Sequence, residues 1–179
     1  MASLFTHAII PLSLKISGGK RVHISWKLCA LGVLFTIIPD FDVIAFNLGV
    51  PYQSPFGHRG FTHSMVFAAI CAALIYPVHK VFHPSFILVW GVLFLSMLSH
   101  PLMDALTNGG LGVALLWPLD ETRYFFHWRP VKVSPIGIDN FFNQRGVQVI
   151  LSEIRYLWVP IFITTILLRI LSALSGSHR

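Results

Sequence analysis

Four long apolar stretches dominate this sequence and limit what it can fold into. They lie at residues 28–48, 64–83, 84–106 and 156–174. Each approaches the roughly 20 residues that a helix needs to cross the hydrocarbon core of a bilayer. The composition agrees, because 55% of the 179 residues are hydrophobic and only 11% are charged, whereas about a quarter of a soluble domain is charged. We therefore expect an integral membrane protein, and neither a soluble globule nor a disordered chain.

Two further segments complete the predicted architecture. The apolar segment 3–16 is too short to span a membrane, since at about 1.5 Å per residue a helix there covers about 20 Å. The region 107–155 is polar and rich in glycine, proline and aromatic residues, which predicts a long loop with little regular structure. We predict an all-α membrane bundle that forms one domain over residues 1–179. It would have about four transmembrane helices, a short N-terminal helix and a long polar and aromatic loop.

The basic residues predict both an orientation and a partner. Segment 15–27 has no acidic residue, so it is expected on the cytoplasmic side. Its basic residues are Lys15, Lys20, Arg21 and Lys27. A net charge of +6 is compatible with nucleic-acid binding, but these cations are scattered between apolar segments and form no basic helix face. We therefore expect the lipid bilayer as partner, and no nucleic acid.

Ionisable residues at the ends of the apolar stretches are the least expected feature of the sequence. A charged group at membrane depth costs about 2.5–3.5 kcal/mol or more on insertion scales. If residues 15–27 are cytoplasmic, threading the chain back and forth brings four polar groups to the opposite, outer leaflet. These groups are His7, then Asp40 and Asp42, then His58 and His63, then His100 and Asp104. Their convergence on one leaflet indicates a shared site.

The residue types of this site suit a divalent metal ion. His100 and Asp104 are four residues apart, which puts both side chains on one face of a helix. Asp40 and Asp42 would point apart in a regular helix, but Pro39 predicts a local break that presents both to one centre. Imidazole and carboxylate ligands suit Zn²⁺, with Mn²⁺ as the other choice. The predicted ligands are His7, Asp40, Asp42, His58, His63, His100 and Asp104.

Other residues near the histidine pair suggest supporting roles. Thr62 is expected to cap the helix that follows, and Thr62 and Ser64 are expected to donate hydrogen bonds that support the metal ligands. Arg59 is predicted to clamp an anionic group such as a phosphate. Asp42 or Asp104 could act as a catalytic base instead of a ligand, and the sequence leaves both possibilities open. Structural roles also stay open for single residues, because an interfacial histidine can be a surface group and an Asp-x-Asp pair can cap a helix or pair with Arg59.

These motifs resemble the YdjM-like family of bacterial inner-membrane proteins, and most closely its YbcI-type members. The matching strings are Thr6-His7, Pro39-Asp40-x-Asp42, His58-Arg59-Gly60-x-Thr62-His63-Ser64 and Ser99-His100-x-x-x-Asp104, followed by Leu116-Trp117-Pro118. The resemblance implies a metal-dependent hydrolase of the inner membrane. The family is more distantly similar to zinc-dependent phospholipase C and P1 nuclease, which implies attack on phosphoesters. The glutamate ligand that the phospholipases would imply has no obvious counterpart.

The residues and the resemblance together predict a metal-dependent hydrolase whose site faces the periplasm. Its expected substrate is lipid-linked or amphiphilic, with a phosphoester favoured over other esters. Two alternatives stay open. The same Asp/His cluster could bind or transport a cation, or relay protons, without hydrolysis. It could also hold a structural metal in a non-catalytic scaffold.

Overall fold

Helices form all the regular secondary structure in the part of the chain that the computed structural model describes. The described residues are 1–19, 22–135 and 141–174. Three helical segments are long and apolar enough to cross a membrane, namely Trp26–Ala45, Phe86–Ala105 and Gln144–Leu174, and the segment Leu4–Gly18 is a shorter apolar helix. The predicted all-α bundle with a short N-terminal helix is therefore confirmed. Lys20 and Arg21, which contribute to the predicted orientation, lie outside the described residues.

The second apolar stretch differs from the prediction. In place of one helix over 64–83, the chain forms α5 (Met65–Ala73), a turn, and the short 3₁₀ helix η3 (Tyr76–Val81). Pro77 lies in the first turn of η3, and proline cannot continue an α-helix because it lacks the backbone N–H. The described chain therefore has three helices of membrane-spanning length, where the sequence suggested about four.

The last helix begins earlier than predicted. α7 (Gln144–Glu153), the π-helical turn η4 (Ile154–Trp158) and α8 (Val159–Leu174) follow one another without a break. Asn143 caps α7, because its side chain accepts hydrogen bonds from two backbone N–H groups of the first turn. The predicted loop over 107–155 is thus helical from residue 144 onward.

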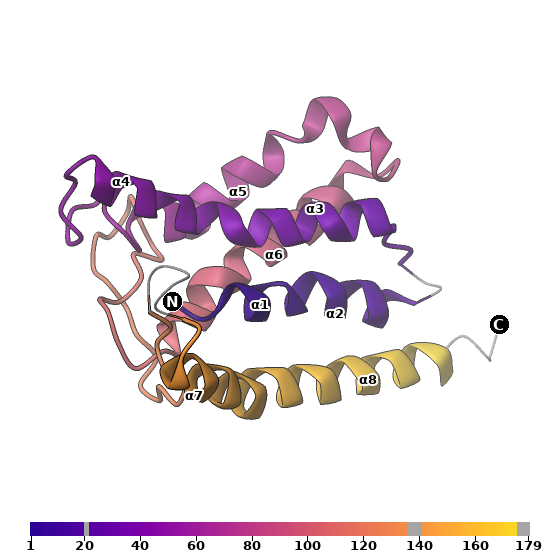
Figure 1. The fold of residues 1–179 in the computed structure, drawn as a ribbon. Helices are drawn as coiled ribbons and strands as arrows, with labels where there is room; N and C mark the ends of the chain where they lie inside the picture. The colour runs from indigo at the N-terminus through magenta and orange to yellow at the C-terminus, as the bar shows by residue number, and fades with distance from the viewer. Residues whose placement is uncertain (20–21, 136–140, 175–179) are drawn as a thin grey trace.

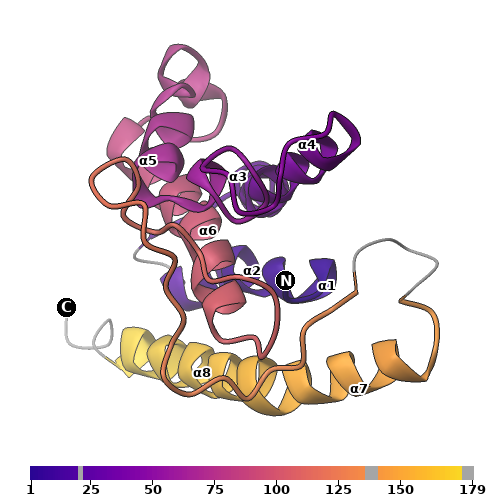
Figure 2. The same cartoon turned by 90° about the vertical axis from the view of Figure 1, so that its left-hand side faces the viewer.

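The main hydrophobic core lies between α3 (Trp26–Ile37), α5 and α6 (Phe86–Ala105). Buried side chains such as Leu28 and Leu93 fill it. α1 (Leu4–His7) and α2 (Ile9–Gly18) follow one another, and α2 contacts α3, α6 and α8 (Figure 1). The N-terminus, α4 (Val43–Asn47) and the described part of the 107–155 region gather at one end of the bundle, which Figure 2 shows face on.

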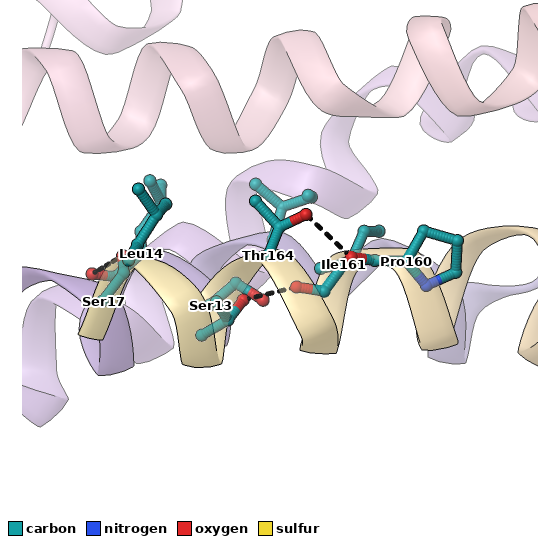
Figure 3. Close-up of a pocket in the computed structure, with 9 residues that line it drawn as sticks. Ser13, Leu14, Ser17, Pro160, Ile161 and Thr164 are labelled. Atoms are coloured by element: carbon teal, nitrogen blue, oxygen red, sulfur yellow. Dashed lines mark hydrogen bonds between the residues drawn. The ribbon is translucent and has the colours of Figure 1, made fainter. Parts of the chain in front are cut away.

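A cavity of about 270 Å³ lies between α2 and α8 (Figure 3). Three of its hydroxyl groups bond within their own helix. Thr164 Oγ1 donates to Pro160 O at 2.9 Å, Thr165 Oγ1 donates to Ile161 O at 2.7 Å, and Ser17 Oγ donates to Leu14 O at 3.2 Å. Ser13 Oγ is buried there without a hydrogen-bond partner in the described chain. The cavity therefore presents a mainly apolar lining.

Candidate metal centre

Asp40 and Asp42 lie near the candidate centre because α3 ends in the 3₁₀ helix η1 (Ile38–Asp42). Pro39 lies in its first turn, where the absence of a backbone N–H disfavours a continued α-helix. The expected local break is therefore present, but it does not present both carboxylates to one centre as predicted. The two carboxylates enter different groups, since Asp40 approaches the histidine of α6 whereas Asp42 approaches the loop before α5.

Four side chains converge on one point, and we call them the primary group. They are Asp40 of η1, His63 of η2 (Phe61–His63), and His100 and Asp104 of α6. One potential ligand atom from each lies within 4.8 Å of the other three. His100 Nε2 lies 3.3 Å from Asp40 Oδ1, and the pairs that His63 and His100 make with Asp104 measure 3.8 and 3.9 Å. Ligands about 2.0–2.2 Å from a tetrahedral ion would be about 3.3–3.6 Å apart, so this spacing is close to what one ion needs.

The atoms that converge are also atoms without hydrogen bonds. Asp40 Oδ1, His63 Nε2, His100 Nε2 and Asp104 Oδ2 are buried, and none makes a well-formed hydrogen bond to any residue that the structure describes. A buried polar atom without a hydrogen bond costs about 1–3 kcal/mol, so four at one point are unusual, even though Asp104 Oδ2 also lies 3.1 Å from the charged Arg59 Nε. A cation at their centre would satisfy all of them. The primary group therefore fits a divalent metal ion.

The other ring nitrogen of each histidine in the primary group is held in place. His100 Nδ1 donates to the carbonyl oxygen of Thr36 at 2.7 Å, so its Nε2 is the ring nitrogen that faces the centre. His63 Nδ1 lies 3.2 Å from Asp42 Oδ2, which orients that ring in the same way. Metal-binding histidines are typically oriented by such partners. Burial also lowers the pKa of His63, which favours the neutral form that binds metals.

Asp42 and His58 form a second group beside the first, together with His63. Asp42 Oδ1 lies 2.6 Å from His58 Nδ1, while Oδ2 accepts hydrogen bonds from Arg59 N at 3.0 Å and Thr62 Oγ1 at 2.7 Å. Both oxygens of Asp42 are thus already hydrogen-bonded. This geometry favours Asp42 as the residue that holds His63 and the loop before α5. The ligand roles predicted for Asp42 and His58 stay predictions.

The cap of α5 is not the one that we predicted. Ser64 caps the helix, because its Oγ accepts a hydrogen bond from Phe67 N at 3.0 Å. Thr62 lies two residues earlier, in η2, and its hydroxyl group donates to Asp42. The expected N-cap role of Thr62 is therefore wrong, and this side chain belongs to the hydrogen-bond network around Asp42.

Arg59 is fully buried and lies at φ 63°, in the left-handed region that residues other than glycine seldom adopt. Its guanidinium group donates to Gly109 O at 3.1 Å, to Leu111 O at 2.8 Å and to Thr107 Oγ1 at 3.2 Å. Its Nε lies 3.1 Å from Asp104 Oδ2. Arg59 therefore ties the segment after α6 to a carboxylate of the primary group. Its role as a clamp for an anionic substrate stays a prediction.

His7 lies at the edge of the primary group. Its ring stacks on His100 with a centroid distance of 3.8 Å and an interplanar angle of 12°. Its Nε2 lies 3.9 Å from Asp104 Oδ1, and neither ring nitrogen has a hydrogen-bond partner among the described residues. Burial lowers the pKa of His7 to about 3, so the imidazole is neutral and able to bind a cation. The structure thus brings all seven predicted ligands together, with four at the centre.

Gly60 gives a direct test of the loop that carries the histidine pair. A Cβ atom at this position would lie 2.0 Å from Pro55 O and 2.8 Å from Gly57 O, and neither backbone oxygen can move freely. We expect Gly60→Ala to lower the free energy of unfolding by about 3 kcal/mol, measured as thermal unfolding in detergent. Gly91→Ala is the matched control, because a Cβ there meets nothing within 4 Å. Equal stability of the two variants would contradict this view of the loop.

Sequence analysis missed one buried carboxylate. Glu153 is 0% exposed and accepts hydrogen bonds from residues of the N-terminal segment. It lies in the region predicted as a loop, and its partners Ser3 and Thr6 are nearly the whole chain away in sequence. The available signal was an acidic residue three positions before the apolar stretch 156–174.

These features define a small helical membrane protein with an Asp/His cluster at one end of its bundle. The family described as YdjM inner membrane protein matches residues 1–176. The chain belongs to this YdjM family, as the sequence motifs predicted, and the predicted inner-membrane location is also confirmed.

Curated relatives agree with this assignment. The inner membrane protein YbcI of Escherichia coli (strain K12) is 40% identical over 161 residues, which cover 89% of this chain and 92% of YbcI. The inner membrane protein YdjM of Escherichia coli (strain K12) is 37% identical over 102 residues, which cover 52% of this chain and 50% of YdjM. YdjM of Shigella flexneri gives the same values. No solved structure matches the chain, and the more distant resemblance to phospholipase C and P1 nuclease stays a prediction.

Proposed function

We propose that this protein is a metal-dependent hydrolase whose primary group holds one divalent ion. The proposal rests on the convergence of four buried ligand atoms that lack hydrogen bonds to the described chain. Two imidazole nitrogens and two carboxylate oxygens suit Zn²⁺ first and Mn²⁺ second. When bound, such an ion supplies a Lewis acid that lowers the pKa of water and polarises an ester bond.

The protein's own residues would prepare and shield this chemistry. Asp42 and the Thr36 carbonyl orient the two histidines, and Arg59 balances the charge of Asp104. Asp40 is the one member of the primary group with an exposed fraction above zero, at 11% of its side chain, so water and substrate would approach from its side. Asp42 and Asp104 stay the candidate bases that could take a proton from water.

The position of the centre supports a periplasmic, amphiphilic substrate. Lys15 lies in the last turn of α2 and Lys27 in the first turn of α3, so both lie at the helix ends away from the primary group. Basic residues there favour the cytoplasmic side for these ends. The cavity between α2 and α8 starts at Ile10, three residues after His7, and extends to Ser17, about 10 Å further along the helix. Its apolar lining fits one hydrocarbon chain. We infer a lipid-like ester, with a phosphoester favoured, whose polar end lies at the primary group.

Hydrolysis of bis(p-nitrophenyl) phosphate by the detergent-solubilised protein with added Zn²⁺ or Mn²⁺ tests the function. We expect turnover by the wild type and by His127→Ala, which removes an exposed histidine. Asp40→Ala and His100→Ala should lower the rate at least about a hundredfold. Equal rates in wild type and His100→Ala would refute the proposal. A wild-type protein that binds metal but hydrolyses no ester would favour cation binding or transport.

The cavity predicts a dependence on the length of the substrate chain. Thr165→Phe would fill the cavity, so we expect it to lower hydrolysis of p-nitrophenyl dodecyl phosphate about tenfold, because buried hydrocarbon contact is lost. Hydrolysis of the methyl analogue should stay unchanged. Ile166→Phe is the control, since Ile166 is 56% exposed on α8. If Thr165→Phe slows both substrates equally, the cavity does not hold the chain.

A further inference from the structure

The N-terminal segment connects two buried carboxylates. On one side, the N–H of Ala2 donates to Asp104 Oδ1 at 2.6 Å, and the ring of His7 stacks on His100. On the other side, Ser3 and Thr6 donate to Glu153 of the long C-terminal helix. Ala2 and His7 thus contact the primary group, whereas Ser3 and Thr6 contact Glu153.

Both carboxylate oxygens of Glu153 accept hydrogen bonds from this segment. Its Oε1 accepts a hydrogen bond from Ser3 N at 2.5 Å, and its Oε2 accepts from Ser3 Oγ at 2.5 Å and Thr6 Oγ1 at 2.8 Å. The residue is 0% exposed, and burying a carboxylate is costly unless hydrogen bonds compensate. Apolar packing alone could hold a short helix here. The three hydrogen bonds to Glu153 also fix where the N-terminal segment sits along its neighbours, which indicates that this position matters.

The π-helical turn η4 reinforces the same contact. It begins directly after Glu153 and ends at Trp158, five residues further on. In a regular α-helix, at about 100° per residue, these two side chains would lie about 140° apart around the axis. Here Trp158 Nε1 donates to Thr6 Oγ1 at 2.7 Å, and the same hydroxyl group donates to Glu153. Such π-helical turns are frequent at functional sites, and this one brings both side chains onto Thr6.

We propose that Glu153 is a positioning residue of the metal centre. It acts through Ser3 and Thr6 to hold His7 against His100 and the Ala2 N–H on Asp104. A one-residue slip of the segment would remove both contacts at once. Because both ring nitrogens of His7 lack hydrogen bonds to the described chain, the segment places an imidazole ready to bind a cation beside Asp104. This inference rests on the proposed metal site, although not on hydrolysis.

A double-mutant cycle on the full chain in detergent tests the proposal. Zn²⁺ affinity is measured by competition with a chromogenic chelator for the wild type, Glu153→Ala, His7→Ala and the double variant. We expect each single substitution to weaken Zn²⁺ binding at least about tenfold, as loss of a residue that orients a metal ligand does. The double variant should be no weaker than the weaker single variant, because Glu153 acts through the segment that carries His7. The visible absorption spectrum of bound Co²⁺ should change in the same way in both single variants.

Three results would overturn the inference. Multiplying effects in the double variant would mean that Glu153 and His7 act independently. Unchanged Zn²⁺ affinity in Glu153→Ala, with lower thermal stability alone, would leave Glu153 a purely structural role. If Glu153→Ala fails to fold, Thr6→Val removes the shared hydroxyl group and keeps the shape, and an unchanged Zn²⁺ affinity there would be equally contradictory.

The outcome also separates this inference from the proposed function. A wild type that binds Zn²⁺ and shows the coupled effects, yet hydrolyses no phosphodiester, would refute the hydrolase and support the role of Glu153. A wild type that binds no Zn²⁺ would refute both.

Discussion

Asp104→Ala is expected to abolish metal binding and to lower the free energy of unfolding by about 3–5 kcal/mol. Asp104 Oδ2 faces the metal position and lies 3.1 Å from Arg59 Nε, and both side chains are 0% exposed. Removing the carboxylate leaves a buried guanidinium group without its counter-charge, which is strongly destabilising. Thermal unfolding and Zn²⁺ titration of the detergent-solubilised protein measure the two effects.

One control variant and one conservative variant complete this test of Asp104. Glu121→Ala removes an exposed carboxylate and should change neither stability nor Zn²⁺ binding. Asp104→Asn keeps an acceptor for the Ala2 N–H, so it should lose the metal while it keeps more stability than Asp104→Ala. Wild-type metal content in Asp104→Ala would exclude this residue from the centre.

Asp42→Ala is expected to weaken Zn²⁺ binding about 10–100-fold without abolishing it. The reason is that Asp42 orients His63 and also accepts hydrogen bonds from Arg59 N and Thr62 Oγ1, while another carboxylate, Asp40, faces the centre. Several buried donors lose their acceptor at once, so stability should also fall by about 2–3 kcal/mol.

Competition with a chelator distinguishes this positioning role from a ligand role. Complete loss of metal, as expected for His100→Ala, would make Asp42 a ligand, which is the role that its sequence motif first suggested. Unchanged affinity would mean that the orientation of His63 does not depend on Asp42. Glu121→Ala again serves as the carboxylate control.

The grouping of the site residues was predictable, because polar residues stand at the ends of successive apolar stretches. The structure does bring His7, His63 and His100 together, although Leu4–Gly18 and α5 are shorter than a membrane span. The spacing of four between His100 and Asp104 likewise places both on one face of α6, with Nε2 and Oδ2 3.9 Å apart.

The sequence did not predict which residues face the centre and which ones orient them. Whether Asp40 or Asp42 faces the centre depends on where α3 gives way to η1, since residues two apart in a 3₁₀ helix point in very different directions. Glu153 was missed for another reason. Its burial depends on Ser3 and Thr6, and no local pattern reveals a contact that spans nearly the whole chain. Because α7 is rich in polar residues, hydropathy alone did not predict that the last helix begins at Gln144.

The metal content of the protein tests the central claim most directly. Protein extracted from membranes in mild detergent, without chelators, is analysed by mass spectrometry of its metals, and the bound metal by X-ray absorption. We predict about one divalent ion per chain in the wild type and in His127→Ala, with nitrogen and oxygen ligands at about 2.0–2.2 Å and no sulfur. His100→Ala should lose this ion. A wild type without stoichiometric metal even after Zn²⁺ is added, or a His100→Ala variant with the same content, would contradict the account.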